Sequence, residues 1–262
     1  MTFGAEPSKI DCRDFRLSNV KKAKLPLEYL PNRKLPNIKN QYYTSSCVPH
    51  AISSILEWNN HSKVPLSTQW IYACKKLLNN SNADVGMSVK QGCAVAVKYG
   101  DVRAAICPGN DEYPKCYEKS KELLQSESTL KSAYKNHAEY YIKLSSEKEI
   151  KYAVTKELLP ILCLKWFSDF KYDSDGKLST SYSGKMSYHA VFVYGYNTQG
   201  FLCQNSWGKE FGVDGRFIIP FSVAKKLLVD SYALIDCPED EIHKPHSNTC
   251  AFFVNLINKI FK

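Results

Sequence analysis

Residues 40–52 read NQYYTSSCVPHAI, a polar, serine-rich turn followed by the start of an amphipathic helix. Apolar residues recur at helical spacing from Val48 onward, which predicts a helix that begins near Cys47. Ser46 suits the position before such a helix, and Pro49 is tolerated in its first turn. Backbone N–H groups at a helix start have no helical partner, and the helix dipole there lowers the pKa of a thiol. The position therefore favours a reactive cysteine over an inert, buried one.

Length and composition indicate a globular protein, since the 262 residues include 44% hydrophobic and 23% charged residues. The formal net charge is +9, but the lysines are scattered, often in pairs, and form no dense basic block. A specific nucleic-acid partner is therefore not expected.

The amino-terminal residues are rich in charged side chains and lack the apolar core of a secretory signal. No apolar run is long enough to cross a membrane. Ten cysteines could form disulfides, but the lack of a signal makes a reducing compartment the simplest one, so we expect an intracellular, cytoplasmic or virion-associated protein. The cysteines lack the paired spacing of a zinc site, and His243 and His246 are too few to bind a metal. No metal and no cofactor is expected.

The first part of the chain predicts an extended arm followed by helices, and strand patterns follow them. Residues 1–40 are rich in Pro, Lys and Asn and predict an extended arm. Helical patterns follow in residues 48–56, 68–78, 88–99 and, in a Lys- and Glu-rich stretch, 117–157. Ser88 is a candidate N-cap of the third helix and Gly100 its stop signal.

Strand patterns follow in residues 158–167, 188–194, 201–205, 216–219 and 232–235, with a loop at 169–187 that turns at Asp175-Gly176. Helices before antiparallel strands are the order of an α+β fold. We expect one domain over residues 1–237, with the arm, a helical lobe at about 41–157 and a β lobe at about 158–237. The cleft between the lobes is the natural place for a site.

Residues 238–262 form a separate amphipathic tail in this interpretation. Apolar residues recur at helical spacing over 250–261, which predicts a helix. Docking on its own domain is the simpler role for such a helix, and contact with a partner or a membrane surface is the alternative.

The second half supplies chemical partners for Cys47. His189 lies in the apolar strand SYHAVFVYGY, and Asn205 follows on the next strand in QNSWGKEFG. Adjacent strands can place the Asn205 oxygen beside one imidazole nitrogen and fix the tautomer, with Trp207 covering that hydrogen bond. A lone histidine there is usually a core residue, but a thiol, a base and a group orienting the base are what a cysteine nucleophile requires. His50 shares a helix face with Cys47, yet Asn205 cannot easily orient it.

The ordered set Gln41, Cys47, His189 and Asn205-Ser206-Trp207-Gly208 resembles the papain family of cysteine proteases in order and spacing. Three weaker pieces agree with it: Asp11-Cys12-Arg13, Leu159-Pro160-Ile161 and Gly212-Val213-Asp214-Gly215-Arg216-Phe217. The resemblance spans about residues 11–235. It implies a two-lobed papain-like fold, with a helical lobe, an antiparallel β-barrel-like lobe and the active-site cleft between them.

The resemblance implies a role for each residue. Cys47 is expected to be the nucleophile, a thiolate paired with the His189 imidazolium, which forms a thioester with a peptide or protein substrate. His189 is expected to protonate the leaving amine and then to activate water, oriented by Asn205. The Gln41 side chain and the Cys47 backbone N–H are expected to form the oxyanion hole.

Several positions depart from the family pattern. Thr44 stands where the family has a disulfide-forming cysteine, which favours a reduced enzyme, although Cys74 and Cys116 could pair by position. Val48 replaces the tryptophan after the nucleophile, so the cleft wall is smaller. Only ten residues precede Asp11, so the inhibitory propeptide of the family is not expected.

The resemblance also implies a substrate-binding surface. Gly86 corresponds to the glycine that pairs with the substrate backbone. Met87 and Ala190 are expected to line the pocket for the second residue before the scissile bond, which suggests an apolar preference, and Trp207 covers the site.

Three functions are compatible with these residues. A papain-like peptidase, most simply an endopeptidase, is the expected one. A catalytically silent binding or structural module is the second, but silent relatives typically replace the cysteine or the histidine. Another Cys-His acyl-transfer enzyme, an amidase or isopeptidase, is the third, because the chemistry is shared.

Overall fold

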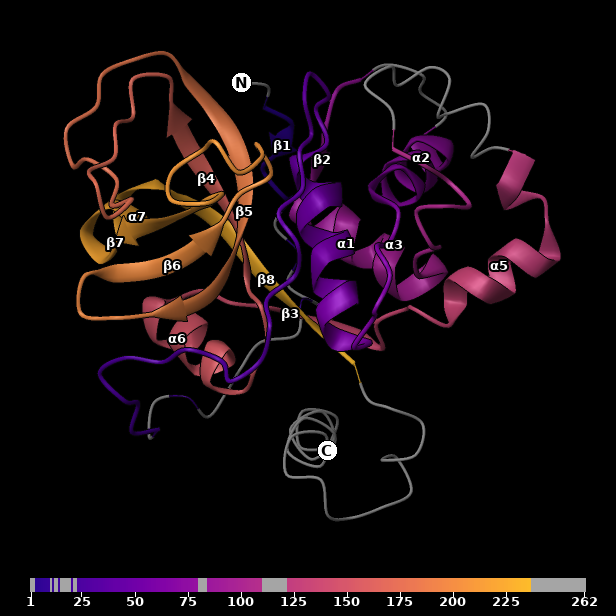
Figure 1. Ribbon diagram of the computed structural model, residues 1–262, viewed down its shortest axis with the longest axis horizontal. Coiled ribbons are helices and arrows are strands. Elements are labelled where there is room, and N and C mark those ends of the chain that lie inside the picture. The colour runs from indigo at the N-terminus through magenta and orange to yellow at the C-terminus, as the bar shows by residue number, and fades with distance from the viewer. Residues whose placement is uncertain are drawn as a thin grey trace.

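The structure is a computed structural model that describes residues 3–9, 11, 14, 20, 23–79, 84–109 and 122–236. Figure 1 shows two parts side by side, with helices in one and a sheet in the other. The helical part contains α1 (Cys47–Asn59), α2 (Thr68–Asn79), α3 (Val89–Tyr99) and α5 (Glu127–Tyr134). The predicted α+β order, helices before strands, is confirmed.

Local side-chain chemistry sets the ends of α3. The Ser88 hydroxyl accepts a hydrogen bond from the Gln91 N–H, and the Gln91 side chain accepts one from the Ser88 N–H, which makes a capping box. At the other end, Gly100 has a φ of 65°, a conformation that glycine adopts at little cost. Both signals were predicted from the sequence.

The sheet has six strands in the order β3-β8-β4-β5-β6-β7, and all neighbours are antiparallel. Its elements are β3 (Tyr140–Lys143), β4 (Ile161–Phe167), β5 (Met186–Tyr196), β6 (Gly200–Gln204), β7 (Arg216–Pro220) and β8 (Leu228–Ile235). The helices α6 (Glu147–Thr155) and α7 (Phe221–Leu227) pack against it. The helical part meets the sheet where α1 contacts β5 and α3 contacts β8.

Some elements differ from the sequence prediction. The stretch 117–157 predicted helices alone, but it contains β3, whose YYIK sequence suits a strand and pairs with β8. The helix α6 follows β3 and packs on the sheet. The sheet part therefore begins earlier in the chain than the expected boundary at residue 158. The short helix α7 was not predicted, because seven residues carry little periodicity.

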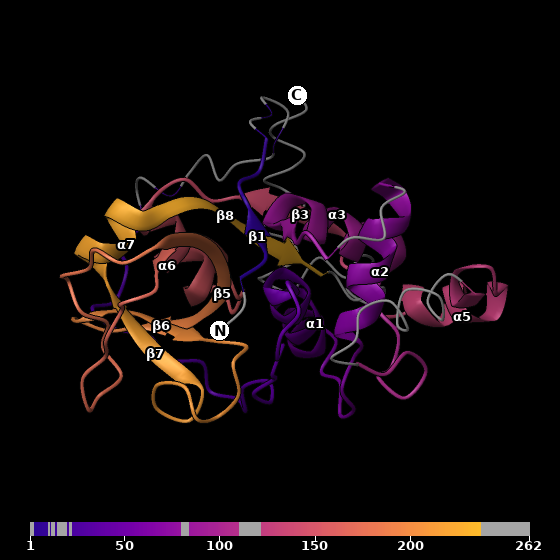
Figure 2. The same ribbon diagram turned by 90° about the horizontal axis from the view of Figure 1, so that it is seen from above.

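The arm contributes a strand at the junction of the two parts. β1 (Ala5–Glu6) pairs in parallel with β2 (Met87–Ser88), and the Met87 N–H donates to the Gly4 carbonyl at 2.9 Å. Figure 2 shows β1 between α1 and β5. Strands of two residues carry no periodicity, so the sequence did not predict this pair.

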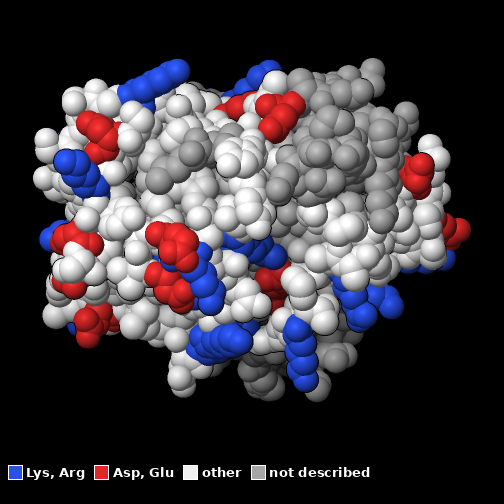
Figure 3. Space-filling view, turned by 45° about the horizontal axis from the view of Figure 1, so that its top comes forward, with Lys and Arg blue, Asp and Glu red and all other residues white. Residues whose placement is uncertain are grey.

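Several predictions fall outside the described residues: the tail at 238–262 with its helix at 250–261, the positions of Cys12 and Arg13, and the pairing of Cys74 with Cys116. The six cysteines of the described part are all buried and have no disulfide partner there. None of the described helices is long and apolar enough to cross a membrane. On the face in Figure 3, acidic and basic side chains are interspersed.

Candidate active site

Cys47 is the first residue of α1, as predicted. Ser46 precedes the helix but its side chain makes no capping bond; its hydroxyl lies 2.6 Å from the Thr44 hydroxyl and 3.2 Å from Nδ1 of His50. The N–H groups of the first helical turn are therefore not capped by this serine. That leaves the start of α1 suited to stabilising negative charge beside Cys47.

His189 and Asn205 meet across two strands. The Nε2 atom of His189, on β5, lies 2.8 Å from Oδ1 of Asn205, which follows β6. An amide oxygen is an acceptor, so His189 carries its hydrogen on Nε2 and Nδ1 is available as a base. Nδ1 has no hydrogen-bond partner among the described residues. The next residue, Ala190, hydrogen-bonds the Cys47 sulfur through its backbone, so β5 brings the histidine to the cysteine.

Aromatic rings enclose this hydrogen bond. The Trp207 ring stacks on the His189 ring with centroids 4.1 Å apart and planes 17° apart. Trp166 of β4 meets both rings edge-on, at 5.3 Å from His189 and 5.2 Å from Trp207. Phe3 of the arm does the same, at 6.0 Å and 5.7 Å. The cover predicted for Trp207 is present in the structure, and two further rings that sequence reasoning missed add to it.

Gln41 is held in one orientation. Its Oε1 accepts a hydrogen bond from the Ser206 hydroxyl at 2.7 Å, and its Nε2 donates to the Thr44 carbonyl at 2.9 Å. Exchanging the amide oxygen and nitrogen would place two acceptors against each other, so these contacts fix which end is the donor. The backbone of Gln41 also donates to the Ser206 carbonyl at 2.8 Å. Gln41 is thereby tied to the loop that carries Asn205.

Residues of the arm cover the nucleophile. The Gly4 backbone hydrogen-bonds the Cys47 sulfur, and a Cβ atom on Gly4 would overlap the Ser45 carbonyl oxygen. The backbone of Gly4 therefore lies directly on the turn before α1. Cys47 and His189 are both completely buried, and the arm forms part of their cover.

Burial sets the protonation of the pair in this arrangement. It raises the pKa of Cys47 to about 11, although backbone hydrogen bonds from Ala190 and Gly4 lower it. Burial also lowers the pKa of His189 to about 4, while the bond to Asn205 raises it. A neutral thiol and a neutral imidazole are thus favoured near neutral pH. The expected thiolate–imidazolium pair is not the favoured form here, because both groups are buried.

The predicted substrate-binding residues Gly86, Met87 and Ala190 lie next to the arm residues that cover Cys47. A Cβ atom on Gly86 would overlap the Gly4 carbonyl oxygen, so Gly86 allows a peptide backbone to approach closely. Met87 and Ala190 are buried and belong to one apolar cluster with Ala5 of the arm. The three predicted residues therefore contact or flank a bound segment of this chain.

Sequence reasoning also missed the anchor of the nucleophile turn. Asp84 accepts the Ser45 N–H through both carboxylate oxygens, at 3.1 and 3.0 Å, and accepts the Tyr72 hydroxyl. A lone aspartate in a polar loop has no periodicity or motif to mark it. His50, the alternative base, places Nδ1 2.7 Å from the Ser46 carbonyl, and burial lowers its pKa to about 4.

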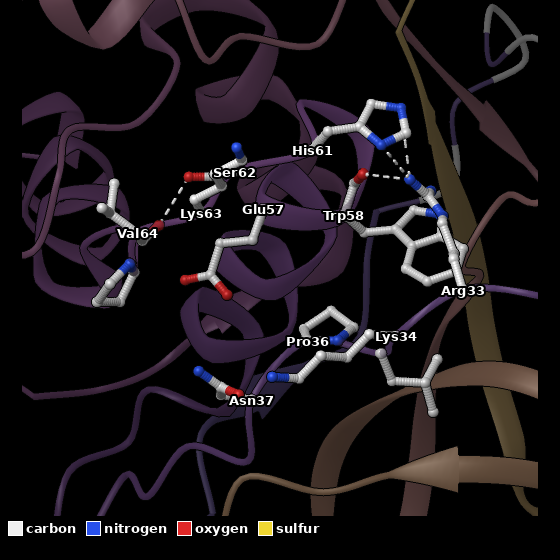
Figure 4. Close-up of a pocket in the computed structure, with 12 residues that line it drawn as sticks. Arg33, Lys34, Pro36, Asn37, Glu57, Trp58, His61, Ser62, Lys63 and Val64 are labelled. Carbon is white, nitrogen blue, oxygen red and sulfur yellow. Dashed lines mark hydrogen bonds between the residues drawn. The ribbon is translucent and has the colours of Figure 1, made fainter.

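A cavity lies at the end of α1 opposite to Cys47. It encloses about 450 Å³ between residues 33–37 and 57–65 (Figure 4). The guanidinium of Arg33 lies 3.2 Å from the Trp58 ring centroid, and Nη1 donates to the Trp58 carbonyl at 3.0 Å. Arg33 therefore packs on the carboxyl end of α1 and donates a hydrogen bond to it. No group of His, Cys, Asp and Glu suited to a metal occurs in the described part of the chain.

Comparisons with known proteins identify the family and the fold. The sequence model described as papain family cysteine protease matches residues 29–235. An uncharacterized peptidase C1-like protein of Acanthamoeba polyphaga mimivirus is 26% identical, over 92% of this chain and 88% of its own length.

Solved structures share the fold. Xylellain, a cysteine protease from Xylella fastidiosa, is 21% identical with a TM-score of 0.76, over 90% of this chain and 96% of its own. The bromelain protease from Ananas comosus, solved with the E64 inhibitor, is 19% identical with a TM-score of 0.64, over 81% of this chain and all of its own. These likenesses confirm a papain-like fold. Because the family match spans most of the sequence, the chain belongs to the papain family of cysteine proteases.

Proposed function

We propose that the protein is a papain-like cysteine peptidase that hydrolyses peptide bonds through Cys47 and His189. The observation that carries the proposal is the His189–Asn205 hydrogen bond of 2.8 Å, buried under Trp207 and joined to Cys47 through Ala190. A base with a fixed tautomer beside a thiol at a helix start is what thiol activation requires.

The reaction proceeds in two acyl transfers. The proton of Cys47 passes to Nδ1 of His189, and the thiolate attacks the scissile carbonyl to give a tetrahedral oxyanion. His189 returns the proton to the leaving amine as the C–N bond breaks, which leaves a thioester. His189 then takes a proton from water while the hydroxide attacks the thioester. As the C–S bond breaks, His189 returns the proton to the Cys47 sulfur and the carboxylic acid product is released.

The oxyanion is stabilised by two donors in this proposal. One is the backbone N–H of Cys47, and the other is Nε2 of Gln41, whose amide orientation is fixed by Ser206 and Thr44. Each such donor contributes on the order of 3 kcal/mol to the transition state.

Residues 3–6 act as a built-in cover in this proposal. Hydrogen bonds of the Gly4 backbone to Cys47 and of its carbonyl to Met87 support this role. Displacement of these residues restores water to Cys47 and His189 and lets the ion pair form.

A silent binding module is the second candidate, because Cys47 and His189 have no exposed surface in this arrangement. An amidase or isopeptidase uses the same chemistry and differs only in substrate.

Active-site labelling tests the proposal. The full chain is treated with a peptidyl epoxide, and adducts are located by intact mass and peptide mapping. We expect one adduct, on Cys47 and on none of the other nine cysteines, which disappears in His189→Ala. Peptide hydrolysis that is lost in Cys47→Ser then separates a peptidase from a silent module. Full hydrolysis by Cys47→Ser would contradict the proposal.

A further inference from the structure

The cavity at the carboxyl end of α1 is lined by three cations that the peptidase mechanism does not use. It encloses about 450 Å³ between residues 33–37 of the arm and residues 57–65. Arg33 and Lys34 reach it from the arm, and Lys63 belongs to the turn after the helix (Figure 4). Like charges that surround one hollow repel one another, and an anion placed between them removes that repulsion.

Glu57 is the acid that lines this cavity, and its charge is already paired. Its Oε1 accepts hydrogen bonds from the Lys39 ammonium group at 2.6 Å and from the Leu66 N–H at 2.7 Å. The Glu57 side chain is 9% exposed, and Lys39 is not among the residues that line the cavity. The charges of Glu57 and Lys39 therefore cancel, and the three lining cations remain in excess.

Arg33 holds its charge at a fixed place in the cavity wall. Its guanidinium stacks on Trp58, and Nη1 donates to the Trp58 carbonyl at 3.0 Å and lies 2.9 Å from Nδ1 of His61. The carboxylate of Glu157, half exposed, lies 3.9 Å from Nε, which has no hydrogen-bond partner among the described residues. Such an exposed pair neutralises little of the arginine charge. A ligand thus meets a cation whose side chain is already ordered.

Lys34 and Lys63 supply charge that can adapt to a ligand. Both side chains are exposed, and neither forms an ion pair with a described residue. Lys34 extends along the cavity in Figure 4. A lysine ammonium group is a mobile point charge with three donors, so these two residues can close on an anion beside the fixed guanidinium.

The end of α1 does not oppose an anion through free carbonyl groups. The last carbonyls of a helix carry its negative partial charge when they are left unpaired. Here the carbonyls of residues 56–58 accept hydrogen bonds from the N–H groups of residues 60–62, at 2.9, 3.0 and 3.2 Å. The turn after the helix therefore caps these carbonyls before it delivers Lys63 to the cavity.

We propose that this cavity binds the phosphate group of a small organic molecule. A phosphate monoester carries between one and two negative charges near neutral pH, and arginine and lysine are the residues that bind such a group. The apolar part of the wall suits the organic part of the ligand; it consists of Leu35, Pro36, Val64 and Pro65. The volume falls in the range of small-molecule sites, about 300–1,000 Å³. The site is distinct from Cys47, because the 13 residues of α1 span about 20 Å.

Amide chemical shifts of the ¹⁵N-labelled full chain test the inference. Phenyl phosphate is titrated at low salt, where charge attraction is least screened. We expect saturable shifts at residues 33–35 and 61–64, with a Kd of about 1 mM. Phenol, the same ring without the phosphate, should leave these shifts unchanged. The inference is overturned by shifts that do not saturate, by shifts confined to other residues, or by equal shifts with phenol.

Matched lysine variants test whether the lining cations recognise the ligand. The double variant Lys34→Met, Lys63→Met keeps two apolar stems and removes two charges. We expect it to raise the Kd for phenyl phosphate by about tenfold, whereas Lys226→Met, which removes an exposed lysine of α7, should not change it. Equal effects of the two variants would mean attraction to the net charge of the protein, and that result overturns the inference. Unchanged amide shifts elsewhere show that each variant is folded.

Two further anions identify the chemical group that is bound. Benzoate keeps the ring but carries a single negative charge, and we expect it to bind more weakly than phenyl phosphate. Equal affinity for benzoate would overturn the assignment to phosphate. Inorganic phosphate lacks the organic part and should also bind more weakly. Equal affinity for inorganic phosphate would support a phosphate site and overturn its assignment to an organic ligand. None of these measurements depends on peptidase activity.

Discussion

At the scale of single residues, each polar group of the site has its direction set by a neighbour. Asn205 fixes which nitrogen of His189 carries the hydrogen, and Ser206 with Thr44 fixes which end of the Gln41 amide is the donor. The sequence predicted the residues but not these supports, since Ser206 stood out only as part of a motif and Thr44 only as a departure from the family pattern. Orientation by contacts of this kind is what allows a donor to act without reorganisation.

Gln41→Ala removes one proposed oxyanion donor. We expect kcat to fall by about a hundredfold or more with little change in KM, because the interaction forms in the transition state. Steady-state kinetics with one fluorogenic peptide measures this. Ser206→Ala is the control: it keeps the donor, loses only its support, and should reduce kcat less. A rise in KM at constant kcat would assign Gln41 to substrate binding instead.

Because His50 is buried, we expect the free energy of unfolding to depend on pH. Histidine titrates near pH 6.5 in an unfolded chain, whereas burial lowers the pKa of His50 to about 4. Between these values the unfolded state binds the proton and the folded state does not. The stabilisation is thus complete above about pH 6.5 and is lost as the pH falls toward about 4.

His50→Gln lacks this titration. We expect the difference in unfolding free energy between wild type and variant to shrink by up to about 3 kcal/mol between about pH 7 and about pH 4. Urea unfolding at several pH values measures it. A difference that stays constant across this range would show that His50 keeps its unfolded pKa in the folded protein.

At the scale of elements, local patterns predicted the local structure. Helical spacing found α1, α2 and α3, and Ser88 with Gly100 marked the ends of α3. Elements made by distant partners were missed. β1 and β2 are two residues each and exist because residues 4–6 lie on residues 86–88, and β3 depends on the edge of β8. No window of neighbouring residues contains that information.

We expect Arg33 to stabilise the carboxyl end of α1. Its guanidinium stacks on Trp58 and donates to the Trp58 carbonyl, as Figure 4 shows. We expect Arg33→Met to lower the free energy of unfolding by about 2 kcal/mol, since it keeps an apolar stem but loses the cation–π contact and a charged hydrogen bond. Lys34→Met, an exposed cation of the same cavity, should change it by less than about 0.5 kcal/mol. Equal effects in urea unfolding would contradict this role.

At the scale of the whole molecule, the two parts and the arm form one site. α1 supplies Cys47, β5 supplies His189, and the arm lies over both. The sequence predicted that the cleft lies between a helical and a β part, and that residues 1–40 extend along the fold. It did not predict that residues 3–6 enter the cleft, because Phe-Gly-Ala-Glu has neither a motif nor a periodic pattern.

A substitution at Gly4 tests most directly whether residues 3–6 cover Cys47. A side chain at this position would overlap the Ser45 carbonyl, so Gly4→Val should push the arm away from Cys47. Water then reaches the thiol, and its pKa falls from about 11 toward that of a helix-start cysteine. We expect iodoacetamide to alkylate Cys47 at least about tenfold faster than in the wild-type chain, since the thiolate is the reactive form.

Pro7→Ala is the matched control for Gly4→Val, because Pro7 is an exposed residue of the same arm. We expect it to leave the alkylation rate of Cys47 unchanged. Peptide mapping reports the rate at each cysteine separately, so buried thiols such as Cys203 show whether Gly4→Val has loosened the whole fold. Acceleration confined to Cys47 identifies a displaced cover. Acceleration at Cys203 as well would mean general unfolding, and no acceleration at Cys47 would mean that the arm does not limit access to the nucleophile.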